Sequence, residues 1–267
     1  MSPQPQPSLG ILNLERGEAA DAMPAAPLRG CLMSSATYDF PVISETVVGA
    51  WVDLVVPGAP ELESACVAAA KRLVERGAVA ISANCGYFIR HQAAVAAAVD
   101  VPVVSSSLLL MPALLGQLPA AAKLAVLVAQ PKHLSEDMLG ITDPFARARV
   151  VIGGIEDSVL VRNENMRPPP PTDLADIEKD VLACAERLRR SHPDIKAFLF
   201  ECTAMPLTAP AVRRMTGLPV YDITTLCRMT LASVASASKY AVEPSAELAV
   251  KLKMGERSCS QYHAEIF

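Results

Sequence analysis

The sequence predicts an α/β fold with two similar lobes, each a mostly parallel sheet flanked by helices, related by pseudo-two-fold symmetry with the active site between them. The first observation behind this prediction is a pair of apolar runs that begin at Gly77 and Ile195 and lead into Cys85 and Cys202. Apolar runs of about six residues bounded by turn signals are typical of buried strands in a parallel sheet. The second observation is that the features following the two cysteines match, which indicates a duplicated unit.

The match between the two halves is one of spacing. Pro102 follows Cys85, and Pro219 follows Cys202, at the same offset of 17 residues, and each proline opens a short β-like run. Two copies that face each other would bring one thiol to each side of a single cleft. In open α/β sheets, ligands bind beyond the carboxyl ends of the strands. Both thiols are therefore expected in the site.

The length and composition fit such a fold. A chain of 267 residues with an apolar content of 51% can bury a large core, and an aromatic content of 4% predicts that Ala, Val and Leu fill it. The expected parts are a flexible tail at 1–8, a first lobe of 9–107 plus 224–267 that carries Cys85, and a second lobe of 108–223 that carries Cys202.

Periodicity and turn signals predict the other elements. Apolar residues recur at helical spacing within 60–76, and a glycine then ends the pattern as a C-terminal cap would. The hydroxyl-rich stretch 31–40 is expected either to line a pocket or to form an ordinary surface loop, and the proline-rich stretch 167–171 to form a stiff solvent loop rather than a lid. Further strands are expected at 9–14, within 40–56, from 101, at 123–128 and at 150–155. Further helices are expected at 87–99, 108–118, 134–139, 172–190, 210–215, 224–239 and 243–253.

Charge and cysteine usage exclude several classes of partner. The net charge is −4 and no basic stripe is present, so nucleic acid is not expected as a partner. Prolines and a glycine interrupt the weakly charged run 101–122, which argues against a membrane span. The start of the sequence does not resemble a signal peptide, and the seven cysteines form no Cys-x-x-Cys pair, so free thiols, a cytoplasmic location and no metal site are expected.

The residues beside the thiols resemble those of a known family. The first strand runs into Asn84-Cys85-Gly86 and the second into Cys202-Thr203. With the matched halves, these motifs resemble the aspartate/glutamate racemase superfamily, which includes amino-acid and hydantoin racemases, maleate cis–trans isomerases and arylmalonate decarboxylases. The resemblance implies catalysis without a cofactor, a small-molecule carboxylate substrate and a homodimer.

Two departures from the superfamily pattern stand beside the thiols. Gly86 and Tyr87 occupy positions where Asn-Thr often follows the first cysteine, and Glu201 occupies a position where glycine often precedes the second. They bear on the substrate more than on the fold.

The resemblance also implies roles for individual residues. Asn84, Gly86 and Thr203 would bind the substrate carboxylate beside the catalytic cysteines, and Asn13, at the end of the first strand, would touch the substrate. The residues alone allow a plainer interpretation, in which Asn84 stabilises its turn and Thr203 caps a helix. Two weaker candidates also fall at strand ends, Ser105 and Gln130.

A pair of thiols suits proton transfer at a carbon atom next to a carboxylate. One thiol removes the proton and the other returns it from the opposite face, and a thiol titrates near pH 8.5, close enough to neutrality to serve in either form. Each cysteine is expected to lead toward a helix N-terminus, whose partial positive charge favours the thiolate. The function expected is thus a racemase or epimerase, an isomerase that acts on an amino acid or related carboxylate through Cys85 and Cys202.

Three alternatives remain open, and two of them use the cysteines differently. In maleate isomerase-like chemistry one cysteine adds to a double bond as a nucleophile. In decarboxylase-like chemistry one cysteine serves only as a proton donor. A non-catalytic two-lobed binding protein would keep its ligand affinity after both cysteines were replaced.

Overall fold

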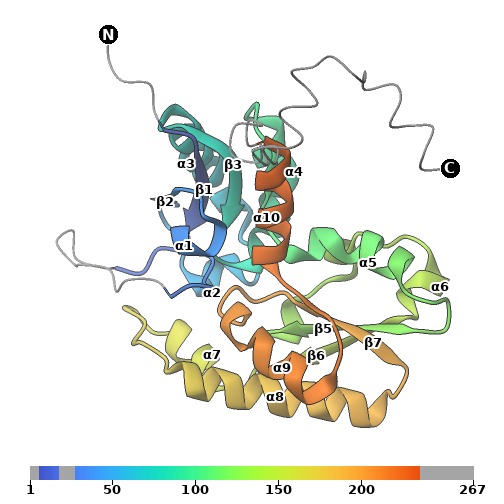
Figure 1. Cartoon of the computed structure of the whole chain (residues 1–267). Helices are drawn as coiled ribbons and strands as arrows, with labels where there is room; N and C mark the ends of the chain where they lie inside the picture. The colour runs from blue at the N-terminus through green and yellow to red at the C-terminus, as the bar shows by residue number, and fades with distance from the viewer. Residues whose placement is uncertain (1–5, 18–27, 235–267) are drawn as a thin grey trace, which may run out of the picture. The chain divides into compact units, whose positions relative to one another are not determined.

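A computed structural model describes residues 6–17 and 28–234 of the chain, and these residues form two parallel sheets with helices around each (Figure 1). Both sheets lie in one compact unit, Met1–Ala232. The predicted α/β class with two similar lobes is confirmed. The first sheet has the order β2-β1-β3-β4, with β1 at Ser8–Asn13, β2 at Val42–Thr46, β3 at Ala78–Ala83 and β4 at Val103–Val104. The second has the order β6-β5-β7-β8, with β5 at Lys123–Val128, β6 at Val150–Gly154, β7 at Ile195–Phe200 and β8 at Val220–Tyr221.

The two sheets agree in register as well as in order. Ile81 pairs with Val103 between β3 and β4, and Phe198 pairs with Val220 between β7 and β8, so both pairs repeat at the period that separates the two cysteines. The pairing of β1 with β3 and that of β5 with β7 each contain one register shift, after the first residue of β1 and of β5. A shared irregularity of this kind supports a duplicated unit more strongly than strand order alone.

Helices cover both sheets. In the first lobe α3 packs against β1, β2 and β3, and in the second α8 packs against β5 and β6 (Figure 1). The helix α10 returns to the first lobe, where Arg228 donates a hydrogen bond to the carbonyl oxygen of Thr37. The α-helices are α1 (Ser35–Tyr38), α2 (Val52–Val55), α3 (Glu63–Glu75), α4 (Gln92–Ala97), α5 (Met111–Gln117), α6 (Pro144–Arg147), α7 (Val159–Glu164), α8 (Leu174–Ser191), α9 (Ala209–Thr216) and α10 (Ile223–Val234). The 3-10 helices are η1 (Pro60–Leu62), η2 (Gly86–His91), η3 (Ser107–Leu110), η4 (Pro131–His133), η5 (Glu136–Leu139) and η6 (Pro206–Thr208).

Side chains of one lobe bind backbone carbonyl groups of the other. The groups bound lie at or just after strand ends and in the loops beyond them. Such bonds satisfy carbonyl oxygens that the sheets leave unpaired, and they fix the distance between the lobes. The pairs are Tyr87 Oη to the Gln130 oxygen at 2.6 Å, Arg90 Nη2 to the His133 oxygen at 2.6 Å, Ser107 Oγ to the Phe200 oxygen at 2.6 Å, and Thr203 Oγ1 to the Asn84 oxygen.

Some local predictions were wrong. The stretch 40–56 contains one strand, within the one or two expected, but it then continues as a turn and α2, and the helix expected from Tyr87 begins as the 3-10 helix η2. Helix α7 stands where no helix was expected. The expected helix at 243–253 and part of the expected tail lie outside the described residues. Within the described ranges, no helix has the length and apolar character that a membrane crossing requires.

Candidate active site

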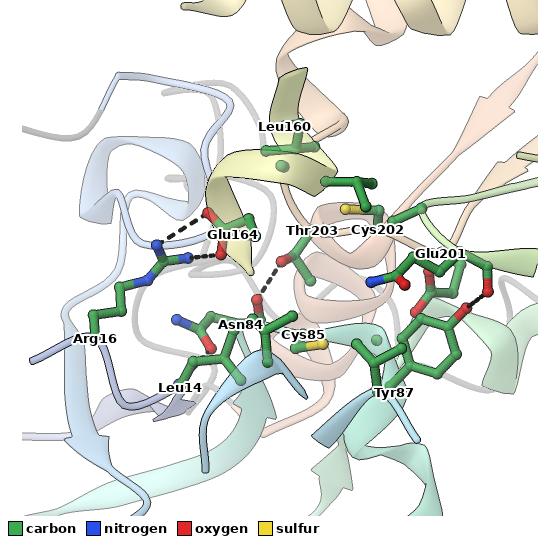
Figure 2. Close-up of a pocket in the computed structure, with 17 residues that line it drawn as sticks. Leu14, Arg16, Asn84, Cys85, Tyr87, Leu160, Glu164, Glu201, Cys202 and Thr203 are labelled. Carbon is green, nitrogen blue, oxygen red and sulfur yellow. Dashed lines mark hydrogen bonds and ion pairs between the residues drawn. The ribbon is translucent and has the colours of Figure 1, made fainter. Parts of the chain in front are cut away.

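A pocket with a volume of about 70 Å³ lies between the carboxyl ends of the two sheets, and both Cys85 and Cys202 line it (Figure 2). Cys85 comes two residues after β3 and Cys202 two residues after β7, and both side chains are half-buried. The predicted meeting of two distant thiols at one cavity is what the structure shows. The other lining residues are Leu14, Arg16, Val52, Val56, Asn84, Gly86, Tyr87, Ala129, Gln130, Leu160, Val161, Glu164, Glu201, Thr203 and Ala204.

Each thiol faces a backbone amide in an equivalent way. The amide of Tyr87 lowers the pKa of Cys85, and the amide of Ala204 lowers the pKa of Cys202, so the relevant N–H lies two residues after the cysteine in both lobes. These amides are also the donors that a bound carboxylate could use.

Glu201 occupies, in the second lobe, the position that Asn84 occupies in the first. The backbone amide of Asn84 donates to Leu12, and that of Glu201 donates to Leu127. Asn84 uses its side-chain oxygen to accept from the backbone N–H of Leu14 at 2.8 Å, which leaves its NH₂ group directed away from this bond. The pseudo-symmetry therefore places a carboxyl group where the other lobe has an amide.

The Glu201 carboxyl group is buried without a hydrogen-bond partner of standard geometry among the described residues. The residue is 1% exposed, and both carboxyl oxygens are unpaired in the described part of the chain. Burial raises the pKa of Glu201 to about 8, an effect that the backbone amide of Ala129 opposes only in part. At neutral pH this group is therefore mostly a neutral carboxylic acid.

Gly86 makes room for this acid. A Cβ atom at Gly86 would lie 2.2 Å from a carboxyl oxygen of Glu201 and 2.5 Å from its backbone oxygen. Any side chain here would collide with the other lobe, so the two departures noted from the sequence, at positions 86 and 201, are halves of one packing arrangement.

The surroundings of both cysteines favour the protonated thiol, which opposes the expectation that helix N-termini would favour the thiolate. Burial, and next the negative charge that Glu201 carries once it ionises above its own raised pKa, raise the pKa of Cys85 well above its usual value and that of Cys202 to about 12. The single amides at Tyr87 and Ala204 oppose these effects but do not outweigh them. Cys85 is followed by a short 3-10 helix, and η6 begins four residues after Cys202, so neither thiol sits on a long helix dipole.

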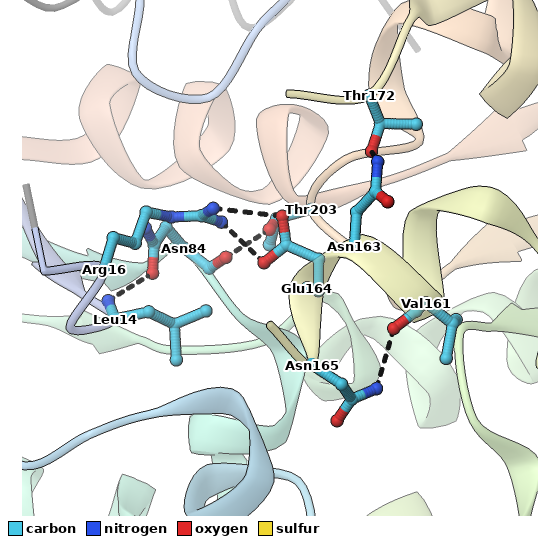
Figure 3. Close-up of polar contacts among 9 residues, drawn as sticks. All are labelled: Leu14, Arg16, Asn84, Val161, Asn163, Glu164, Asn165, Thr172 and Thr203. Atoms are coloured by element: carbon cyan, nitrogen blue, oxygen red, sulfur yellow. Dashed lines mark hydrogen bonds and ion pairs between the residues drawn. The ribbon is translucent and has the colours of Figure 1, made fainter. Parts of the chain in front are cut away.

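An ion pair joins the lobes at the same pocket. Arg16, just after β1, donates two hydrogen bonds to Glu164, the last residue of α7, at 3.0 and 2.8 Å (Figure 3). Their side chains are 32% and 22% exposed, so the pair lies where the pocket meets solvent. The charge of Glu164 raises the pKa of both thiols, and that of Arg16 lowers the pKa of Cys202.

Of the other residues predicted for the site, some line the pocket and some do not. Asn84, Gly86, Gln130 and Thr203 line the pocket. Asn13 lies beside it, in an adjoining depression that also contains Arg16 and Asn84. Ser105 is outside the lining and instead donates to Gln92 Oε1 at 2.6 Å.

Sequence reasoning did not assign Arg16, Glu164, Glu201 or Tyr87 to the site. Arg16 follows the same strand end as Asn13, so position alone could have included it. Glu201 is adjacent to Cys202, and its presence in an apolar strand end was a signal. Glu164 had no comparable signal, because nothing in the sequence marks the orientation of α7.

Solved structures with the same fold include enzymes that work on carboxylates. A mutant of arylmalonate decarboxylase superposes with a TM-score of 0.54 at 16% identity, covering 86% of this chain and 94% of that one. Glutamate racemase from Aquifex pyrophilus superposes with a TM-score of 0.54 at 13% identity, covering 94% and 96%. The fold is therefore the one found in arylmalonate decarboxylase and glutamate racemase, as the resemblance implied.

Curated relatives define the family more narrowly. No family model matches the chain. Dimethylsulfoniopropionate lyase from Durusdinium sp. clade D is 31% identical over 207 residues, covering 73% of this chain and 67% of the relative. Dimethylsulfoniopropionate lyases 3 and 7 of Emiliania huxleyi are 29% and 27% identical over 248 residues, covering 88% of this chain and 62% and 70% of their own lengths. The chain belongs to the dimethylsulfoniopropionate lyase family.

This finding corrects the function expected from the sequence. The expectation was a racemase or epimerase, an isomerase, whereas the curated relatives are named lyases. The error arose because a fold and a pair of short motifs do not determine which reaction a site carries out.

Proposed function

We propose that this chain is a dimethylsulfoniopropionate lyase that eliminates dimethyl sulfide and leaves acrylate. The observation that carries the proposal is the meeting of Cys85 and Cys202 at one small pocket, in a chain whose curated relatives are named for this activity. The volume of about 70 Å³ suits a ligand of few atoms.

The proposed reaction begins with removal of a proton from the carbon next to the carboxylate. A thiolate accepts that proton, and the electrons of the C–H bond form the new double bond. The bond between the neighbouring carbon and the sulfonium sulfur then breaks, and its electron pair leaves on sulfur as neutral dimethyl sulfide. The leaving group needs no proton, so one thiolate base is sufficient.

Cys202 is the better candidate for the base. Burial raises the pKa of Cys202, and the positive charge of Arg16, which lines the same pocket, is among the influences that lower it. The base must also lie near the substrate carboxylate, because the proton comes from the adjacent carbon. Cys85, on the other side, closes the pocket and faces the reacting carbons.

The substrate itself favours the active form of the base. Burial, as the main cause, raises the pKa of Cys202 to about 12. A sulfonium cation that enters this pocket attracts the thiolate, because water screens the two charges less in a partly buried site than in bulk solvent. The carboxylate would accept from the Asn84 NH₂ group and from the backbone amides that follow the thiols.

The test is release of dimethyl sulfide from dimethylsulfoniopropionate, measured by headspace gas chromatography. We expect the natural chain to release it, Cys202→Ser to lose roughly 10³-fold in kcat, and Cys85→Ser to lose at least about tenfold. The matched control is Cys31→Ser, since Cys31 is also a half-buried free thiol but does not line the pocket. Failure of the natural chain to release dimethyl sulfide, or full activity in Cys202→Ser, would contradict the proposal.

A further inference from the structure

The ion pair between Arg16 and Glu164 is part of the pocket rather than a remote brace. Both side chains line the cavity together with both thiols. Arg16 is the sole basic residue among its described lining residues, and Glu164 and Glu201 are the acidic ones. Because Glu201 is buried and mostly neutral at neutral pH, the ion pair supplies the fixed charges of the site.

A second ion pair between the lobes shows that bracing does not require this position. Arg167 donates to both carboxylate oxygens of Asp53, at 2.5 and 2.7 Å, and its guanidinium also stacks 4.5 Å from the ring of Trp51. These two side chains are 46% and 50% exposed and do not line the pocket. The chain therefore offers a matched contact of the same kind outside the site.

We propose that Arg16 and Glu164 form a clamp that selects a zwitterion, with Arg16 binding the substrate carboxylate and Glu164 facing the onium cation. This inference rests on the proposed lyase function, whose substrate carries both charges. Arg16 and Glu164 thus act as specificity residues that touch the two ends of the substrate.

Charge balance explains why a zwitterion fits and a simple ion does not. A carboxylate alone would draw Arg16 away and leave Glu164 without a partner in a partly buried site. A cation alone would leave Arg16 unpaired in the same way. Removing one member of a partly desolvated pair is costly, whereas a ligand with both charges replaces both partners at once.

The placement of the clamp agrees with the chemistry. Arg16 and Cys202 line the same small pocket, so a carboxylate bound to Arg16 would lie near the proposed base. Glu164 lines the pocket together with both thiols, so a cation beside it would lie within the same pocket. The acidic carbon then lies between the carboxylate and the cation, within reach of Cys202.

The experiment compares two probes of equal shape by isothermal titration calorimetry. One is trimethylammoniopropionate, a zwitterion. The other is its carbon isostere, in which a tert-butyl group replaces the trimethylammonium. We expect the natural chain to prefer the zwitterion by about tenfold or more, Glu164→Gln to lose most of that preference, and Arg16→Met to weaken binding of both probes by about tenfold to a hundredfold.

Two further variants separate the clamp from a brace. In the double variant R16E/E164R the ion pair is kept but its charges are exchanged, so a brace would survive and a clamp would not bind the zwitterion. Arg167→Met removes the other ion pair and is expected to bind both probes as the natural chain does. Equal affinity of the natural chain for the two probes, an unchanged preference in Glu164→Gln, or normal binding by R16E/E164R would each overturn the clamp.

The outcomes for the clamp and for the lyase are distinguishable. Calorimetry with these probes does not require turnover. If the chain selects the zwitterion but releases no dimethyl sulfide, the clamp is supported and the lyase function is contradicted. If the chain releases dimethyl sulfide but binds both probes equally, the lyase function is supported and the clamp is contradicted.

Discussion

At the residue scale, the state of the two thiols depends on burial and on Glu201. Both influences disfavour a negative charge on sulfur, and they raise the pKa of Cys202 to about 12. The proposed reaction needs a thiolate base, whereas these two influences favour the protonated thiol. This arrangement keeps a reactive thiolate from persisting without substrate, and it makes the rate depend on what enters the pocket.

The first prediction concerns pH. The quotient kcat/KM reports the free enzyme, whose thiol pKa values are raised, so it should rise with pH through the alkaline range. The constant kcat reports the complex, in which the sulfonium favours the thiolate, so its rise should come at lower pH. Initial rates of dimethyl sulfide release between about pH 6 and pH 10 would show this separation. Coincident profiles, or a kcat/KM that falls as pH rises, would refute it.

The second prediction concerns Glu201 and stability. Its pKa is about 8 in the folded chain against an ordinary value of 4.5, so between these values the unfolded chain loses a proton that the folded chain keeps, and stability falls as pH rises. At about 1.4 kcal/mol per pH unit, the full interval corresponds to about 5 kcal/mol. We therefore expect Glu201→Gln to be several kcal/mol more stable than the natural chain at pH 9 and close to it near pH 4.5, as measured by urea unfolding.

The control for this prediction is Glu61→Gln, at an exposed residue of η1. Its stability should follow that of the natural chain at every pH. A gain in Glu201→Gln that stayed constant with pH would show that the buried carboxyl group does not cause the penalty. The penalty itself is of the kind that functional sites retain, since the group faces the thiols.

At the element scale, the strands that carry the thiols were predictable and the details after them were not. Strands β3 and β7 are apolar runs with glycine or polar boundaries. The local sequence therefore predicts both that they are strands and where they end. The equal spacing of cysteine and proline then identified the duplication. The register of β3 with β4, and that of β7 with β8, repeats this spacing in three dimensions.

Elements that depend on contacts between the lobes were missed. Helix α7 is a short run rich in β-branched residues, which locally favours a strand, yet the Ser158 hydroxyl accepts from the backbone amide of Val161 and starts a helix. The reversal matters for the site, because α7 ends at Glu164. Likewise, η2 begins at Gly86, which lies close to Glu201 of the other lobe, a contact that no local pattern reveals.

At the scale of the whole molecule, the site exists only where the lobes meet. Each lobe supplies one thiol and one member of the ion pair. Hydroxyl groups on both sides donate to carbonyl oxygens across the boundary, among them Tyr87 to Gln130 and Ser107 to Phe200. An unpaired buried carbonyl costs about 1–3 kcal/mol, so these bonds oppose separation of the lobes.

The last prediction follows from this coupling. Leu73 in α3 and Leu188 in α8 occupy corresponding core positions, 0% and 7% exposed, one under each sheet. Each substitution to alanine should cost about 2–5 kcal/mol, because it removes buried apolar volume. Since both sheets belong to one compact unit, Met1–Ala232, both substitutions should lower the same single thermal transition, by calorimetry and by circular dichroism. If instead Leu73→Ala lowered one transition and Leu188→Ala another, the lobes would unfold independently, and the contacts across the boundary would orient the thiols without stabilising the fold.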